Sequence, residues 1–253
     1  MGTPSTMADL SRGLSEALAL LDFEPPVTHV YDPTHYARRP HRAYLRFARP
    51  GVEALLLGMN PGPWGMAQTG VPFGEVAHVR DFLGIHTAAN RPRCEHPKRP
   101  VLGFDCPRSE VSGRRLWSWV EDRFGTAEAF FRRFFVWNWC PLAFLEESGR
   151  NRTPDKLPAA ERTPLETLCD AALVEIVARL QPKMVIGVGA FARKRAERAV
   201  GHLVQVEQIL HPSPASPAAN RGWAPQVETQ LEAMGIVLPT AACGSRKAEV
   251  ESH

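Results

Sequence analysis

The sequence predicts an α/β fold: a three-layer α/β/α sandwich around a central, mainly parallel sheet of four strands. Four short runs of apolar, aromatic and β-branched residues alternate along the chain with segments whose apolar residues recur at helical spacing. This order implies right-handed crossovers, which make neighbouring strands parallel and place helices on both faces of the sheet. The length of 253 residues, with 44% hydrophobic and 23% charged residues, fits one globular domain.

Each expected strand is short and continuously apolar, as in a sheet that is buried on both faces. The second of them is rich in aromatic residues and stops at Pro141, which cannot continue a central strand. The four expected strands are Ala54–Leu57, Phe134–Cys140, Lys183–Val188 and Val204–Leu210.

The expected helices have apolar residues on one face, and three of them are closed by Gly84, Gly125 and Gly201. They are Met7–Leu21, Glu75–Leu83, Glu110–Phe124, Ala127–Arg133, Pro164–Leu180, Ala190–Val200 and Ala224–Met234. Residues 23–49 are expected to be a linker, and 148–158 a polar loop. The loop at 86–108 is longer than loops that only connect two elements usually are, so we expect it to be functional. One domain therefore spans residues 1–238, followed by a disordered polar tail at 239–253.

Composition excludes several classes of protein. No apolar stretch approaches the ~20 residues of a membrane span, and the first twenty residues lack the pattern of a signal peptide. The five cysteines are scattered, without a C-x-x-C pair, which indicates reduced thiols and neither zinc nor an iron–sulfur cluster. The net charge of +3 permits a polyanionic partner without requiring one.

The loop Gly58–Gly74 directly follows the first expected strand and contains five glycines and three prolines. Glycine lets the backbone approach a flat ligand closely, while proline keeps such a loop open. The loop also carries an amide, Asn60, and an aromatic ring, Phe73, which suit a planar heterocycle. A glycine-rich connection with Phe73 in the core explains the pattern equally well. The loop matches neither a Walker phosphate loop nor G-x-G-x-x-G.

Two further polar side chains lie at strand ends. Asn138 is inside the second expected strand, where an amide is costly unless it is hydrogen-bonded, and His211 follows the fourth. Because the carboxyl ends of parallel strands meet at one edge, Asn60, Asn138 and His211 should lie close together. Structural roles for Asn138 and His211 are the alternative. The proline-rich segment Pro214–Ala219 has the shape of a wedge for duplex DNA, or is a plain surface loop.

The same stretches carry a family resemblance. The motifs are Gly58–Gly62, Val71–Glu75, Glu95–Gly103, Ser109–Gly113, Trp137–Leu142, Ser148–Asn151 and His211–Pro214. From about Val27 to Met234 the chain resembles the single-strand-selective monofunctional uracil-DNA glycosylases, family 3 of the uracil-DNA glycosylase superfamily. The resemblance implies that residues 1–238 form one glycosylase domain. Such an enzyme flips uracil, or a related deaminated or oxidised base, out of DNA and hydrolyses the N-glycosidic bond to leave an abasic site.

The resemblance also implies roles for individual residues. Asn60 would position the attacking water, and His211 would donate a hydrogen bond to the departing uracil anion. The implied substrate-binding residues are Met59, Gly62, Met66, Phe73 and Asn138, with Phe73 stacking on the base and Asn138 reading its edge. The implied DNA-binding residues are Ser213, Pro214, Ala215, Ser216, Pro217, Asn220 and Arg221. No lysine lies in the motifs that carry Asn60, Phe73, Asn138 and His211, so a Schiff base and strand cleavage are not expected.

The partners implied are single-stranded and double-stranded DNA containing uracil or other deaminated bases. No cofactor, metal or membrane is expected, and the protein should be a monomer, cytoplasmic if bacterial and nuclear if eukaryotic. Vertebrate members carry an Arg-Asn pair where this chain has Ala215-Ser216, which should weaken its grip on duplex DNA, and Trp64 replaces a usual Phe.

Three other functions stay open at this point. The first is a non-catalytic single-stranded nucleic-acid-binding protein, and the second is a glycosylase whose main substrate is xanthine or hypoxanthine. The third is a hydrolase of free nucleosides or nucleotides. A zinc base deaminase is disfavoured, because its His-x-Glu and Pro-Cys-x-x-Cys patterns are absent.

Overall fold

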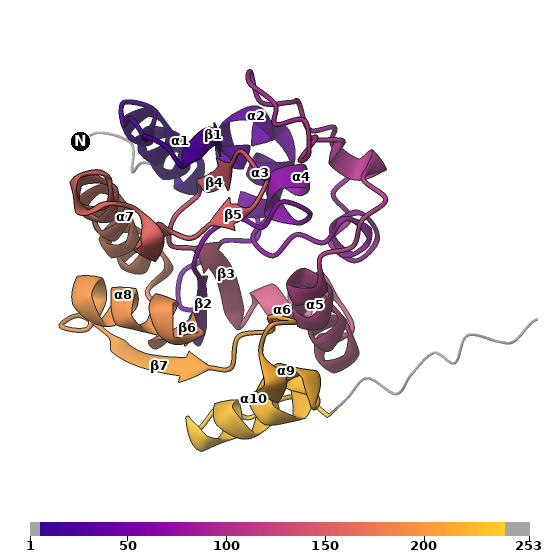
Figure 1. Cartoon of the computed structure of the whole chain (residues 1–253). Coiled ribbons are helices and arrows are strands. Elements are labelled where there is room, and N and C mark those ends of the chain that lie inside the picture. The colour runs from indigo at the N-terminus through magenta and orange to yellow at the C-terminus, as the bar shows by residue number, and fades with distance from the viewer. Residues whose placement is uncertain (1–5, 241–253) are drawn as a thin grey trace, which may run out of the picture.

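The computed structural model describes residues 6–240 and is centred on a parallel sheet with the strand order β3-β2-β6-β7 (Figure 1). Its strands are β2 (Ala54–Gly58), β3 (Phe134–Asn138), β6 (Met184–Val188) and β7 (Gln205–Ile209). Strand β2 pairs with β3 on one side and with β6 on the other, and Gly58 lies opposite Asn138. The expected four-stranded parallel sheet is therefore confirmed.

Helices cover both faces of this sheet, as the α/β prediction requires. Figure 1 shows α7 and α8 on one side and α5 and α10 on the other. Gly187 lets helix α8 lie close to β6, since a Cβ at this position would overlap the backbone of Arg193. The long helices are α1 (Met7–Leu18), α5 (Val111–Phe124), α7 (Ala159–Leu180), α8 (Ala190–Val200) and α10 (Trp223–Ala233). Shorter helices are α6 (Ala127–Phe131), α4 (Met66–Thr69) and α9 (Pro217–Asn220).

The linker expected at residues 23–49 is wrong. This segment forms β1 (Val27–Tyr31), α2 (Pro33–Tyr36) and α3 (Arg38–Leu45). Strand β1 pairs antiparallel with β4 (Ala143–Glu146), and β4 with β5 (Asn151–Arg152), in a second sheet of three strands. The many Pro, His and Arg residues hide these elements, although Asp32 caps α2 and Pro33 starts it, as both residue types commonly do.

Several boundaries also differ from the prediction. Helix α7 begins at Ala159, so Pro164 lies inside its second turn instead of at its start. The loop at 148–158 contains β5 and a 3₁₀ turn, η3 (Pro154–Lys156), and the helix expected at Glu75–Leu83 is a π-helix, η1 (His78–Phe82). A further 3₁₀ turn, η2 (Gly103–Asp105), lies in the long loop at 86–108. Residues 241–253 of the expected tail lie outside the described residues.

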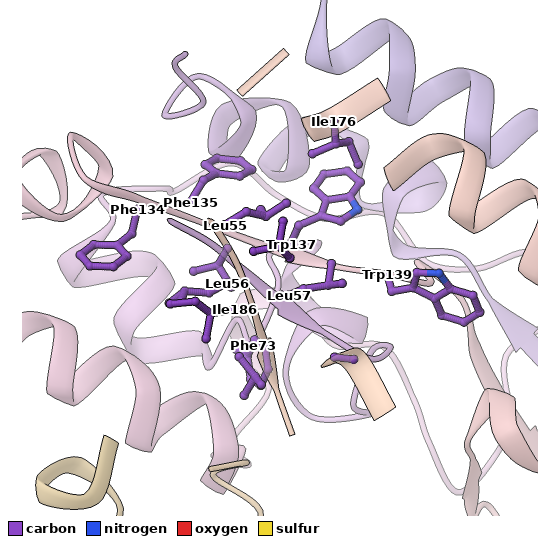
Figure 2. Close-up of a cluster of buried hydrophobic side chains, with 14 of the residues drawn as sticks. Leu55, Leu56, Leu57, Phe73, Phe134, Phe135, Trp137, Trp139, Ile176 and Ile186 are labelled. Carbon is purple, nitrogen blue, oxygen red and sulfur yellow. The ribbon is translucent and has the colours of Figure 1, made fainter. Parts of the chain in front are cut away.

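Large aromatic side chains fill the core beside the sheet. Figure 2 shows the leucines of β2 packed among Phe134, Phe135 and Trp137 of β3. Phe130 stacks on Phe134 with ring centroids 5.4 Å apart. Burial of such rings is the main term that stabilises the fold. In residues 6–240, no helix combines the length and the apolarity that crossing a membrane requires.

Candidate active site

Three side chains expected at the sheet edge line one pocket of about 360 Å³. Asn60 follows β2, Asn138 ends β3, and His211 follows β7, so the parallel topology brings together residues that are far apart in the sequence. The pocket is lined by Met59, Asn60, Gly62, Phe73, Glu110, Ser112, Asn138, Asn151, Thr153, His211 and Ser213. Met66 lies directly behind this lining, since its Sδ accepts a hydrogen bond of 3.2 Å from Asn138 Nδ2.

Gly58 decides how the base of the pocket is packed. A Cβ at this position would overlap Asn138 Oδ1 and come within 2.6 Å of Phe73 Cε2. Only glycine therefore lets the aromatic ring and the amide meet over the end of β2. The sequence motif contained Gly58, but nothing in the sequence pointed to this contact.

Phe73 has a backbone conformation that few residues with a side chain adopt, with φ +53°. Two contacts from α5 hold it there. Trp117 Nε1 donates to the Phe73 carbonyl at 3.1 Å, and Gly113 leaves room for that same carbonyl. Phe73 is buried, as the core interpretation expected, and its ring also forms a wall of the pocket.

The two amides differ in how they are held. Asn60 Nδ2 donates to the carbonyl of Leu142 at 3.1 Å, which leaves its Oδ1 free to accept a hydrogen bond in the pocket. Asn138 is only 4% exposed, and among residues 6–240 the one hydrogen-bond partner of its side chain is the weak acceptor Met66 Sδ. Both amides thus keep hydrogen-bonding capacity for a ligand.

His211 presents a defined face to the pocket. Its Nδ1 accepts a hydrogen bond of 3.0 Å from the backbone N–H of Ser213. Burial lowers the pKa of His211, so the ring is neutral at pH 7. A neutral ring that accepts at Nδ1 carries its proton on Nε2, which makes Nε2 a donor. Gly189, with φ +91°, lets His211 lie close, since a Cβ there would be 3.1 Å from the histidine Cβ.

The expected wedge is a folded segment, because residues 214–221 include the short helix α9. Arg115 of α5, which sequence analysis missed, clamps it. Its Nη1 donates to the carbonyls of Pro212 at 3.1 Å and Ser213 at 3.3 Å, and its Nη2 donates to Asn220 Oδ1 at 2.8 Å. Asn220 Nδ2 donates in turn to the Pro214 carbonyl at 2.8 Å.

The expected DNA-binding residues therefore differ in what they offer a ligand. Pro214, Ala215, Pro217 and Arg221 are exposed, Ser213 lines the pocket, and Ser216 caps α9. The Asn220 side chain is committed to the clamp.

Glu110 is the most unusual pocket residue that sequence analysis missed. Burial, together with the nearby Glu75, raises the pKa of Glu110 to about 7. Within the described part of the chain, no hydrogen-bond donor contacts its carboxyl group, whose oxygens lie against Gly62 and Gly65. Its only sequence signal was the motif Ser109–Gly113. Asn151 and Thr153, also missed, come from the second sheet and the residues that follow it.

Comparisons with known proteins agree with this geometry. The Uracil DNA glycosylase superfamily model matches residues 45–231. A single-strand selective monofunctional uracil-DNA glycosylase from Rattus norvegicus is 52% identical over 228 residues, covering 88% of this chain and 82% of the rat protein. The Bos taurus protein of that name is 51% identical over 228 residues, covering 88% of this chain and 84% of its own.

The fold has a solved counterpart as well. The crystal structure of wild-type Pedobacter heparinus SMUG2 superposes with a TM-score of 0.62 at 16% identity, covering 89% of this chain and 97% of that one. This likeness shows the architecture, and the closer relatives show the family. The chain belongs to the single-strand-selective monofunctional uracil-DNA glycosylase family of the uracil-DNA glycosylase superfamily.

Proposed function

We propose that this chain removes uracil from DNA by hydrolysing the N-glycosidic bond, leaving an abasic site. The observation that carries the proposal is the convergence of Asn60, Phe73, Asn138 and His211 on one pocket, in a chain 52% identical to a named uracil-DNA glycosylase. Uracil must leave the base stack to enter such a pocket.

Each of these side chains has a task in that reaction. Phe73 stacks on the flipped base, and the Asn138 amide reads its edge, rejecting cytosine, whose donor and acceptor pattern is reversed there. Met66 supports Asn138 from behind, and the backbone near Met59 and Gly62 completes the pocket wall.

The chemistry separates two charges, since the sugar becomes cationic while uracil leaves as an anion. Asn60 Oδ1 orients the water that attacks the sugar carbon, because Asn60 Nδ2 is held by Leu142. His211 Nε2–H donates to the 2-oxo oxygen, where the negative charge grows. Asn60 is too weak a base to dominate catalysis, so stabilisation of the departing anion supplies most of the rate.

The reaction stops at the abasic site, because no lysine is among the residues that line the pocket to form a Schiff base. We further propose that the protein acts as a monomer, on single-stranded DNA in preference to duplex. The small Ala215 and Ser216 side chains at the exposed loop support this preference, since they fill little of the gap that a flipped base leaves. Such an enzyme works where DNA is, in the cytoplasm of a bacterium or the nucleus of a eukaryote.

The direct test uses end-labelled oligonucleotides with one uracil, single-stranded or paired with guanine, followed by alkali. We expect cleavage at uracil only after alkali and without added metal, and faster abasic-site formation in the single strand. Release of xanthine or hypoxanthine but not uracil would reassign the substrate. Binding without release of any base would refute the glycosylase.

Glu110 makes activity sensitive to pH. Below its pKa of about 7 the carboxyl is neutral, and above that value it ionises. A carboxylate in the pocket repels the departing uracil anion, so the single-turnover rate should fall as pH rises from about 6 to 9. We expect Glu110→Gln, which stays neutral, to lose this alkaline decline.

The control for this profile is Glu128→Gln, which removes a carboxylate on the exposed surface of α6. It should keep the decline unchanged. Glu75, whose pKa is lowered by hydrogen bonds from His78 despite its burial, stays ionised across the whole range. An unaltered decline in Glu110→Gln would contradict the assignment.

A further inference from the structure

Two arginines converge on Trp64 at the rim of the pocket. The Arg108 guanidinium carbon lies 4.5 Å from the Trp64 ring centroid, and that of Arg99 lies 5.2 Å from it. Trp64 stands between Gly62 and Gly65, which lie against the pocket residue Glu110. The three residues therefore form a rim cluster beside the base pocket, defined here as Trp64, Arg99 and Arg108.

The charges of the rim cluster have no counter-ion within the described residues. Arg99 Nη1 donates to the Lys98 carbonyl at 2.9 Å, while its buried Nε has no hydrogen-bond partner. A Cβ on Gly149 would come within 3.5 Å of the Arg99 guanidinium carbon, so this group is confined between Trp64 and the loop before β5. A half-buried guanidinium held without a carboxylate is a site for an anion from outside the chain.

Several other partly buried arginines have carboxylate partners. Arg123, Arg133 and Arg195 each form an ion pair with a carboxylate, as arginines in partly buried positions normally do. Within the described residues, Arg99 and Arg108 have no such carboxylate partner.

We propose that Arg99 and Arg108, held by Trp64, bind one backbone phosphate of the DNA strand beside the flipped nucleotide. This inference rests on the proposed function and adds a second grip to the loop at 211–221. Helix α4 begins two residues after Trp64, and Figure 1 shows α4 and α9 on opposite sides of β2 and β3. A DNA strand bound by both the rim cluster and the loop at 211–221 would cross the mouth of the pocket, with the flipped nucleotide between the two contacts.

A phosphate fits the cluster better than a base does. Guanidinium groups present planar N–H pairs that match phosphate oxygens in a bidentate manner. Both guanidinium groups lie within stacking distance of the tryptophan ring and so compete with a base for its faces. Trp64 acts by holding the two charges in place, which lowers the entropic cost of binding.

The test measures binding of a single-stranded oligonucleotide carrying 2′-deoxy-2′-fluorouridine, whose fluorine slows glycosidic cleavage. We expect Arg108→Ala or Arg99→Ala to weaken binding about fivefold. The slope of log affinity against log salt should fall by about 0.7 for each lost phosphate contact. Trp64→Ala changes no charge and should weaken binding about threefold, whereas Trp64→Phe should restore most of it. The matched control is Arg93→Ala, an exposed arginine of the same loop, which should change neither quantity.

Neutral methylphosphonate linkages then locate the contact. Placed one at a time around the uracil analogue, one linkage should weaken binding by the unmodified protein about fivefold, weaken binding by Arg108→Ala less, and have no effect on a variant that carries both Arg99→Ala and Arg108→Ala. Equal sensitivity of both proteins at every position would overturn the proposal. So would an unchanged salt slope in both arginine variants. Because this test measures binding to a probe that is cleaved only slowly, its failure is distinct from an absence of glycosylase activity.

Discussion

Replacing His211 with Ala should lower the single-turnover rate of uracil release by about 10²- to 10³-fold, the usual cost of losing one donor to a developing oxyanion. The donor is Nε2–H, because Nδ1 is occupied by the Ser213 amide. Asn60→Ala should cause a loss of similar size, since the attacking water then lacks its oriented acceptor. Rates are measured with protein in excess over a single-stranded uracil oligonucleotide.

The control for both variants is His202→Ala, which removes an exposed histidine after α8 and should leave the rate unchanged. Circular dichroism and thermal unfolding establish that each variant is folded. Near-normal rates in both folded variants would remove Asn60 and His211 from the mechanism, and loss in Asn60→Ala alone would place the anion-stabilising donor elsewhere.

Asp170→Ala should destabilise the protein by about 3 kcal/mol, because it removes one of the two carboxylates that pair with the buried Arg195 and leaves Trp139 Nε1 without its acceptor. The Arg195 side chain is 7% exposed, pairs with Asp170 and Glu166, and lies over the Trp139 ring. Asp170 also accepts a hydrogen bond of 2.8 Å from Trp139 Nε1. Urea unfolding at pH 7 measures the free energy of unfolding.

Asp170→Asn offers an intermediate case, since an amide oxygen can still accept from Trp139 but cannot neutralise Arg195. Glu197→Ala is the matched control, because its ion pair with Arg193 is about half exposed and should contribute less than about 1 kcal/mol. A loss in Asp170→Ala no larger than in the control would show that water or another group compensates the arginine.

Sequence patterns predicted the central sheet because its strands are continuously apolar and flanked by helical periodicity. They also brought Asn60, Asn138 and His211 to one edge, which follows from parallel topology alone. The second sheet escaped prediction because β1 is short and interrupted by two adjacent polar residues, Thr28 and His29, and because its partner β4 lies far along the chain.

The rest of the pocket depends on contacts that leave no local signal. Glu110 looked like the first residue of a helix, yet its carboxyl faces the pocket. Nothing in the sequence distinguished Arg115 from other polar residues of that helix, yet it clamps the loop after β7. Phe73 adopts its left-handed conformation because Trp117 and Gly113 hold its carbonyl, which no propensity predicts.

The Arg115 clamp has a consequence for how damage is found. It ties the loop at 212–220 to α5, and the first turns of α5 contact Phe73 and the pocket wall. The loop and the pocket therefore form one preorganised unit. A rigid loop does not change its shape to fit the DNA. The free energy needed to open a base pair is then set by the DNA itself. Bases that leave the stack at a low free-energy cost, in single strands and at mismatches, then enter the pocket most often. The flexibility of the DNA therefore determines which bases are tested before the pocket residues distinguish uracil from other bases.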